Sequence, residues 1–146
     1  MLALDSNTIS YYFRGDPRVV ARLQALRPAD LGVPAIVEYE LRHGLRRLPP
    51  EAAQPRLTAL VQMLRPLQVL PFDSECATHA ARIRVQLEAA GTPIGPNDTL
   101  IAATALRYRA TLVTRNAREF SRVAGLQWVN WHAADESATP TPPPPP

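Results

Sequence analysis

Five short apolar runs recur along this chain, and a segment with the apolar spacing of a helix separates each run from the next. Short, nearly continuous apolar strands that alternate with helices are typical of a mainly parallel sheet with helices on both faces. The sequence therefore predicts an α/β fold with a central sheet of about five short strands. The predicted strands are Leu2–Asp5, Leu31–Val33, Leu67–Phe72, Thr111–Thr114 and Leu126–Val129.

The length and the distribution of proline predict one domain followed by a tail. A chain of 146 residues is long enough for one core, since domains typically contain roughly 100–200 residues. The apolar periodicity runs through residues 1–135 without an internal repeat, so we expect this stretch to form one compact unit. Residues 136–146 hold six of the sixteen prolines, which predicts a disordered or polyproline-II tail.

Composition excludes several classes of protein and of site. No apolar run approaches the roughly 18–20 residues of a membrane span, and the start of the chain lacks the basic region of a secretory signal. We therefore expect a cytoplasmic protein with no membrane contact. The single cysteine, Cys76, excludes an internal disulfide and a thiolate metal cluster. All sixteen basic residues are arginine, which excludes chemistry that needs a catalytic lysine.

Polar side chains are expected together at the carboxyl edge of the sheet, where parallel α/β proteins place their sites. Asp5 ends the first strand, and Glu40 lies on the helix after the second. Asp98 begins the helix before the fourth strand, and Asn116 and Glu119 follow that strand. Oxygen ligands from distant parts of the chain are therefore predicted to converge.

Two of the acidic residues also have a simpler structural interpretation. Taken alone, Asp98 at a predicted helix start is most readily a helix N-cap. Glu38 stands four residues before Arg42, which is the favourable order for an exposed ion pair on a helix. Asp5 is harder to explain in this way, because a carboxylate that ends a buried strand pays a desolvation cost unless it is paired, hydrogen-bonded or bound to a cation.

A divalent metal would explain why several carboxylates share one edge. Neighbouring carboxylates repel each other unless a cation neutralises them. Oxygen ligands without sulfur select Mg²⁺ or Mn²⁺. The natural reaction of such a site is metal-assisted hydrolysis of a phosphodiester, in which water attacks and leaves a 5′-phosphate and a 3′-hydroxyl.

Four blocks of this sequence resemble the successive motifs of PIN-domain ribonucleases, specifically VapC-type toxins of bacterial toxin–antitoxin pairs. The resemblance covers about residues 1–130 in order and spacing. It implies a PIN-like three-layer fold, Mg²⁺ or Mn²⁺ dependence, endonucleolytic cleavage of RNA, a homodimer, and neutralisation by a cognate VapB-type antitoxin. The blocks are Leu4-Asp5-Ser6-Asn7, Glu40-Leu41-Arg42-His43-Gly44, Asn97 to Ala105, and Leu112 to Phe120.

The resemblance assigns roles residue by residue. Asp5 and Asp98 would be the main metal ligands, and Glu40 would complete the acidic cluster. Asn116 stands where many relatives have a fourth acidic residue, and Glu119 is near enough in sequence to supply that charge. Three further residues would support the site, although each also suits a cap or a turn; Ser6 and Asn7 in particular suit the cap of the first helix. These supporting residues are Ser6, Asn7 and Thr114.

Three other interpretations remain open at this stage. A receiver-type or phosphotransferase fold also ends a strand with Asp, but it usually relies on a late lysine, which this chain lacks. A non-catalytic PIN-fold binding module is favoured only by Asn116, and a PIN nuclease acting on DNA keeps the same chemistry. Several arginines are candidates for contacts to phosphates or to acidic side chains of an antitoxin. They are Arg14, Arg42, Arg46, Arg47, Arg115 and Arg118.

Overall fold

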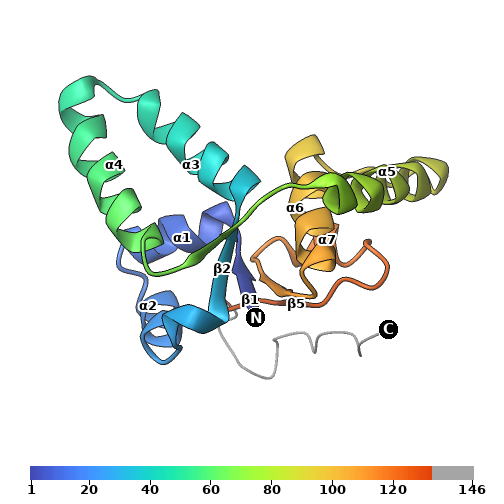
Figure 1. Ribbon diagram of the computed structural model, residues 1–146, viewed down its shortest axis with the longest axis horizontal. Coiled ribbons are helices and arrows are strands. Elements are labelled where there is room, and N and C mark those ends of the chain that lie inside the picture. The colour runs from blue at the N-terminus through green and yellow to red at the C-terminus, as the bar shows by residue number, and fades with distance from the viewer. Residues whose placement is uncertain (133–146) are drawn as a thin grey trace.

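The computed structural model describes residues 1–132, which form a five-stranded parallel sheet flanked by helices (Figure 1). The strand order is β3-β2-β1-β4-β5, and every neighbouring pair is parallel. The predicted α/β class and the number of strands are confirmed. The strands are β1 (Leu2–Leu4), β2 (Leu31–Pro34), β3 (Gln68–Leu70), β4 (Thr111–Val113) and β5 (Trp128–Val129).

Seven α-helices connect these strands within the described residues. In Figure 1, α1 to α4 lie on one side of the sheet and α5 to α7 on the other. This division follows from the strand order, because right-handed crossovers place helices on opposite faces once the chain reverses direction across the sheet. The helices are α1 (Ser6–Phe13), α2 (Pro17–Gln24), α3 (Ala35–Arg46), α4 (Pro50–Leu64), α5 (Ser74–Ala89), α6 (Pro96–Arg107) and α7 (Ala117–Phe120).

Two predicted helix starts are wrong in detail, and both bear on the site. Asp5, and not Ser6 or Asn7, caps α1, because Asp5 is the last residue in the extended conformation before the helix and its carboxylate accepts from the N–H of Thr8. Asp98 does not cap α6. That helix begins at Pro96 after Gly95, since proline suits the first helical position.

The core lies around the two central strands. Ala3 and Leu4 of β1 and Leu112 and Val113 of β4 are completely buried. Burying a leucine side chain contributes roughly 1.5–3 kcal/mol, so the centre of the sheet is the rigid base of the carboxyl edge. Cys76 is also fully buried, as its apolar stripe predicts.

Two predictions about the chain outside this core have different outcomes. No helix within residues 1–132 is long and apolar enough to cross a membrane. The predicted proline-rich tail, residues 136–146, lies outside the described residues, as do the last residues of the predicted 1–135 unit.

Candidate active site

Asp5 lies at the carboxyl end of β1, beside the end of β4. Its backbone N–H donates to the carbonyl oxygen of Val113 at 3.2 Å, and its side chain is only 5% exposed. Carboxylate Oδ1 accepts from the N–H of Thr8 at 2.8 Å and from the hydroxyl of Thr8 at 2.7 Å. Burial raises the pKa of Asp5, and hydrogen bonds from Thr8 and Thr114 oppose that rise.

Glu40 on α3 is held at both of its carboxylate oxygens. The hydroxyl of Ser6 donates to Oε1 at 2.5 Å, and the Nδ2 amide of Asn97 donates to Oε2 at 3.3 Å. One carboxylate thereby joins the starts of α1 and α6 to α3. Asn97 was not predicted as a site residue, although its position directly before Asp98 was the available signal.

Asp98 and Glu119 lie within hydrogen-bonding reach of each other, from the first turn of α6 and from α7. The pKa of Asp98 is raised to about 7, first by burial, then by the hydrogen bond and the charge of Glu119, and then by the charges of Glu40 and Asp5. The structure therefore brings together the four carboxylates that the sequence predicted would converge. We call Asp5, Glu40, Asp98 and Glu119 the acidic cluster.

The remaining predicted residues differ in their closeness to this cluster. Thr114 is completely buried; it bonds to Asp5, and its hydroxyl accepts from the N–H of Asn116 at 2.9 Å. Asn116 is half-buried and precedes α7 without a capping bond from its side chain. Asn7 is exposed on α1. The predicted Glu38–Arg42 ion pair is present, with 2.7 Å between Oε2 and Nε.

The acidic cluster is suited to a divalent cation by its donor atoms and its charge. Among residues 1–132, no three His, Cys, Asp or Glu side chains are already arranged to hold a metal ion. The donors that do converge are carboxylate oxygens, which Mg²⁺ and Mn²⁺ prefer. No arginine forms an ion pair with these four carboxylates within the described residues, so their repulsion is left for a cation to relieve.

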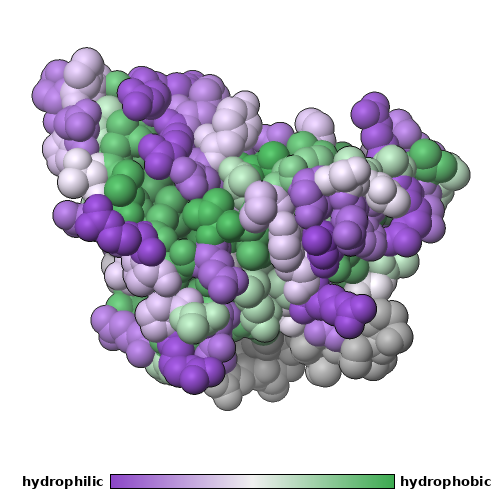
Figure 2. All heavy atoms as spheres, in the orientation of Figure 1, coloured by the Kyte–Doolittle hydropathy of each residue, from purple (hydrophilic) through white to green (hydrophobic). Residues whose placement is uncertain are grey.

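An apolar groove opens beside the cluster, between α1, α3 and α4. Its volume is about 580 Å³, and its lining includes Ser6, Glu40, Leu41, Gly44 and Leu60. Apolar side chains gather over these helices in Figure 2. A Cβ atom built on Gly44, one helical turn beyond Glu40, would meet no atom within 4 Å, so this part of the groove is open.

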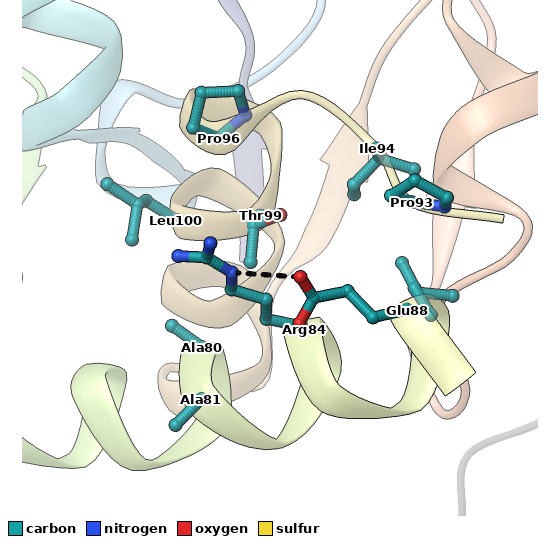
Figure 3. A pocket seen from close by; sticks show the side chains of 10 residues that line it. Ala80, Ala81, Arg84, Glu88, Pro93, Ile94, Pro96, Thr99 and Leu100 are labelled. Carbon is teal, nitrogen blue, oxygen red and sulfur yellow. Dashed lines mark ion pairs between the residues drawn. The ribbon is translucent and has the colours of Figure 1, made fainter. Parts of the chain in front are cut away.

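A second cavity, of about 630 Å³, lies between α5 and the start of α6 (Figure 3). Its charged lining residues, Arg84 and Glu88, pair with each other at 3.6 Å. None of the acidic cluster lines this cavity. This cavity therefore lacks a cluster of charged side chains that could hold a metal or act on a substrate. The candidate site is the acidic cluster.

Two ribonucleases resemble this chain over most of its length. It is 32% identical over 129 residues to the tRNA(fMet)-specific endonuclease VapC of Salmonella typhimurium, covering 88% of this chain and 96% of the relative. It is also 32% identical over 130 residues to ribonuclease VapC1 of Haemophilus influenzae, with the same two coverages.

Solved structures agree with the sequence comparison. FitAcB from Neisseria gonorrhoeae matches with a TM-score of 0.81 and 34% identity, covering 91% of this chain and 100% of the other. DNA-bound VapBC from Salmonella typhimurium matches with a TM-score of 0.82 and 30% identity, covering 89% and 97%. The sequence profile of the PIN domain matches residues 2–126. Given this match and the parallel sheet with acidic residues at its carboxyl edge, the chain belongs to the PIN domain family.

Proposed function

We propose that this protein is an endoribonuclease toxin that hydrolyses RNA with Mg²⁺ or Mn²⁺ held by Asp5 and Asp98. The observation that carries the proposal is the environment of Asp98, whose carboxyl lies against Glu119 and near two further carboxylates. Such a concentration of negative charge costs stability unless a cation is bound. The names of the ribonuclease relatives support RNA as the substrate.

Each residue of the acidic cluster has a part in this reaction. A divalent cation, when bound, lowers the pKa of water and stabilises charge on phosphoryl oxygens. Thr8 and Thr114 orient the Asp5 carboxylate and favour its ionised form. Burial and then the neighbouring carboxylates, Glu119 first among them, raise the pKa of Asp98 to about 7, and Glu119 would add negative charge beside a cation held by Asp98.

Glu40 has a different part, because both of its oxygens are already bound. Ser6 and Asn97 fix its orientation, and it adds negative charge to the cluster. We therefore assign Glu40 to positioning the acidic cluster. Asn116 contributes a neutral amide next to the backbone bond that it makes to Thr114, and Glu119 replaces the missing fourth acidic residue.

The two other interpretations of the fold receive less support. A binding module without activity has no need to gather four carboxylates with an unfavourable charge. A deoxyribonuclease would fit the same chemistry, but the ribonuclease relatives carry the names of RNA-cleaving enzymes. RNA therefore remains the proposed substrate.

Cleavage of total cellular RNA by the purified full chain tests the proposal. We expect discrete fragments with 5′-phosphate ends in Mg²⁺ or Mn²⁺, no fragments in EDTA, and a loss of about 100-fold or more in the Asp98→Asn variant. Glu75→Gln, an exposed carboxylate at the start of α5, is the matched control and should cleave normally. Cleavage that survives both EDTA and Asp98→Asn would rule out this mechanism.

Regulation forms a second part of the proposal. Solved neighbours include VapBC complexes, which supports neutralisation by a VapB-type antitoxin, and a homodimer is the proposed assembly. We place the antitoxin segment in the groove between α1, α3 and α4, because an apolar segment there would cover Glu40 and Ser6. Gly44→Leu should fill this groove, since the site of the new side chain is open.

Two measurements test the regulatory proposal. A protein that copurifies with the Asp98→Asn chain should inhibit cleavage by the wild-type enzyme, and this inhibition should weaken in Gly44→Leu. Light scattering of the purified toxin should give the mass of two chains. A monomer, or full inhibition of Gly44→Leu, would contradict the corresponding part.

A further inference from the structure

Tyr11 on α1 and Arg115 in the loop after β4 lie in contact, although 104 residues separate them. The guanidinium of Arg115 donates to the hydroxyl of Tyr11. Its central carbon lies 5.5 Å from the centroid of the Tyr11 ring. Both arginine and ring are therefore held in one arrangement at the surface, where Arg115 is exposed.

A second arginine contacts the same ring. The guanidinium carbon of Arg14 also lies 5.5 Å from the Tyr11 centroid, and Arg14 is exposed. Within residues 1–132, neither Arg14 nor Arg115 forms an ion pair with a carboxylate. In contrast, Arg42, Arg84 and Arg107 all do. The two positive charges beside Tyr11 are thus available to an external anion.

His132 fixes the Tyr11 ring from the end of the described chain. The two ring centroids are 4.2 Å apart. His132 Nδ1 lies 3.7 Å from a carboxylate oxygen of Asp16, and Arg18 donates to the His132 carbonyl oxygen at 3.0 Å. Arg18 adds a third positive charge near the ring, whereas Asp16 adds one negative charge whose carboxylate already accepts from the backbone at the start of α2. The patch remains positive. We call Tyr11, Arg14 and Arg115 the tyrosine–arginine patch.

Both segments that form the patch are close in sequence to residues at the acidic cluster. Arg115 follows Thr114, whose side chain bonds to Asp5, and Tyr11 belongs to the helix that Asp5 caps. A polyanion that approaches four carboxylates is repelled by them. Positive charges beside the carboxylates offset this repulsion and attract the strand.

We infer that the tyrosine–arginine patch binds a backbone phosphate of the RNA strand next to the phosphate that is cleaved. Arg115 supplies a planar fork that matches phosphate oxygens, and the Tyr11 hydroxyl holds that fork in place. Arg14 adds charge from the C-terminal end of the same helix. The inference rests on the proposed function, and it adds a subsite that orients the substrate without touching the reacting atoms.

Binding of a labelled single-stranded RNA to the full chain in EDTA tests the patch without cleavage. We expect Arg115→Gln to weaken binding about 5- to 10-fold near 100 mM salt. The slope of log affinity against log salt should fall by about 0.7 for each phosphate that the variant no longer neutralises. Arg14→Gln should act in the same direction. Arg84→Gln is the matched control, because it removes an exposed arginine that is already paired with Glu88, and it should leave the slope unchanged.

Tyr11→Phe separates positioning from charge. This variant keeps the ring and removes only the hydroxyl that holds Arg115. We expect about a 2- to 3-fold decrease in RNA affinity, smaller than that of Arg115→Gln, with the salt slope retained. In the cleavage assay with Mg²⁺, both variants should raise KM and change kcat by less than about twofold.

Three outcomes would decide the matter. Affinity and slope in Arg115→Gln equal to those of Arg84→Gln would overturn the inference. Weaker binding of Arg115→Gln to a hexaglutamate peptide, with RNA binding unchanged, would also overturn it and assign the patch to an acidic protein segment. If the wild-type chain cleaves no RNA but the patch variants still bind RNA more weakly, the proposed function fails and the subsite stands.

Discussion

Asp5 and Asp73 have the same local position in two regions of the molecule, and their electrostatic surroundings are opposite. Each follows a strand and caps the next helix, with its carboxylate accepting from the N–H three residues on, at 2.8 Å for Asp5 and 3.0 Å for Asp73. Asp73 has Arg107 at 3.1 Å. Its pKa is lowered, first by the backbone bond from Cys76 and also by Arg107.

Asp5 has no arginine partner among the described residues, and burial raises its pKa. Its neighbours in the acidic cluster are also negative. A cap is a local property, fixed by where a strand ends and a helix begins. Whether an arginine lies beside the carboxylate depends on the tertiary fold. This difference separates a structural aspartate from one that is available to a metal and a substrate.

The largest expected difference between the two aspartates is in catalysis. Asp5→Asn keeps a side chain that can cap α1 but removes the negative charge, so RNA cleavage should fall by about 100-fold or more. Asp73→Asn, the same change at a cap paired with arginine, should cleave at the wild-type rate. Initial rates on one RNA, at equal concentrations of folded protein, measure the contrast. Equal losses of cleavage in the two variants would contradict the proposed difference between Asp5 and Asp73.

Metal binding should stabilise the Asp5 and Asp73 variants to different extents. A metal at about 100 times its Kd that binds only the folded state adds about 2.7 kcal/mol to the free energy of unfolding. We expect Mn²⁺ to stabilise the wild-type chain and Asp73→Asn in this way, and to have little effect on Asp5→Asn. Denaturant titrations with Mn²⁺ and with EDTA provide the measurement. An equal gain in Asp5→Asn would place the ion elsewhere.

The pH dependence of stability should have opposite signs at Asp98 and Asp73. The folded-state pKa of Asp98, about 7, lies above its ordinary value of 3.8, so its contribution is complete below about pH 4 and is lost as pH rises through 7. In EDTA the melting temperature should therefore fall over that range, and Asp98→Asn should flatten the fall. The pKa of Asp73 is lowered, so its contribution is present above its ordinary value and is lost only as the pH falls below it. A wild-type melting temperature that rises between pH 4 and 7 in EDTA would contradict the sign for Asp98.

The smallest expected effect follows from removing the structural cap. Asp73→Ala removes the acceptor for the Cys76 N–H and the partner of Arg107, which should lower the melting temperature by about 2–4 °C. Cleavage at a temperature well below melting should remain normal. Asp73→Asn should recover most of the stability, because asparagine also caps helices. A loss of RNA cleavage in fully folded Asp73→Ala protein would show that the Asp73 cap and the acidic cluster are coupled.

Much of the fold could be predicted because its signals are local. Apolar runs marked all five strands, and the parallel arrangement implied that Asp5, Glu40, Asp98 and Glu119 would meet at one edge. The cap of α1 was misplaced because Asp5, Ser6 and Asn7 are all good capping residues, and only the end of β1 decides among them. The start of α6 was placed late for a similar reason, since Pro96 had already fixed the first turn.

The partners of the carboxylates could not be predicted from the sequence. Glu40 and Asn97 are 57 residues apart, and Asp73 and Arg107 are 34 apart. Such pairs depend on how helices pack and on which rotamers their side chains take. Nothing in the spacing of Asp5 and Asp73 tells which of them will receive an arginine. The tyrosine–arginine patch was hidden for the same reason, although Arg14 and Arg115 were already candidates for contact with phosphate.

The two hydrogen bonds that the Glu40 carboxylate accepts, from Ser6 and from Asn97, have a consequence for the synthesis of the protein. Ser6 and Glu40 lie in the first third of the described residues and Asn97 in the last third, so the bond between Asn97 and Glu40 spans 57 residues and forms after local structure. A nascent chain that ends before α6 lacks both Asn97 and Asp98 and cannot assemble the acidic cluster. Because a domain generally folds as a unit, the toxin gains its activity only when translation of the domain is nearly complete, and the ribosome that makes it carries an inactive chain until then.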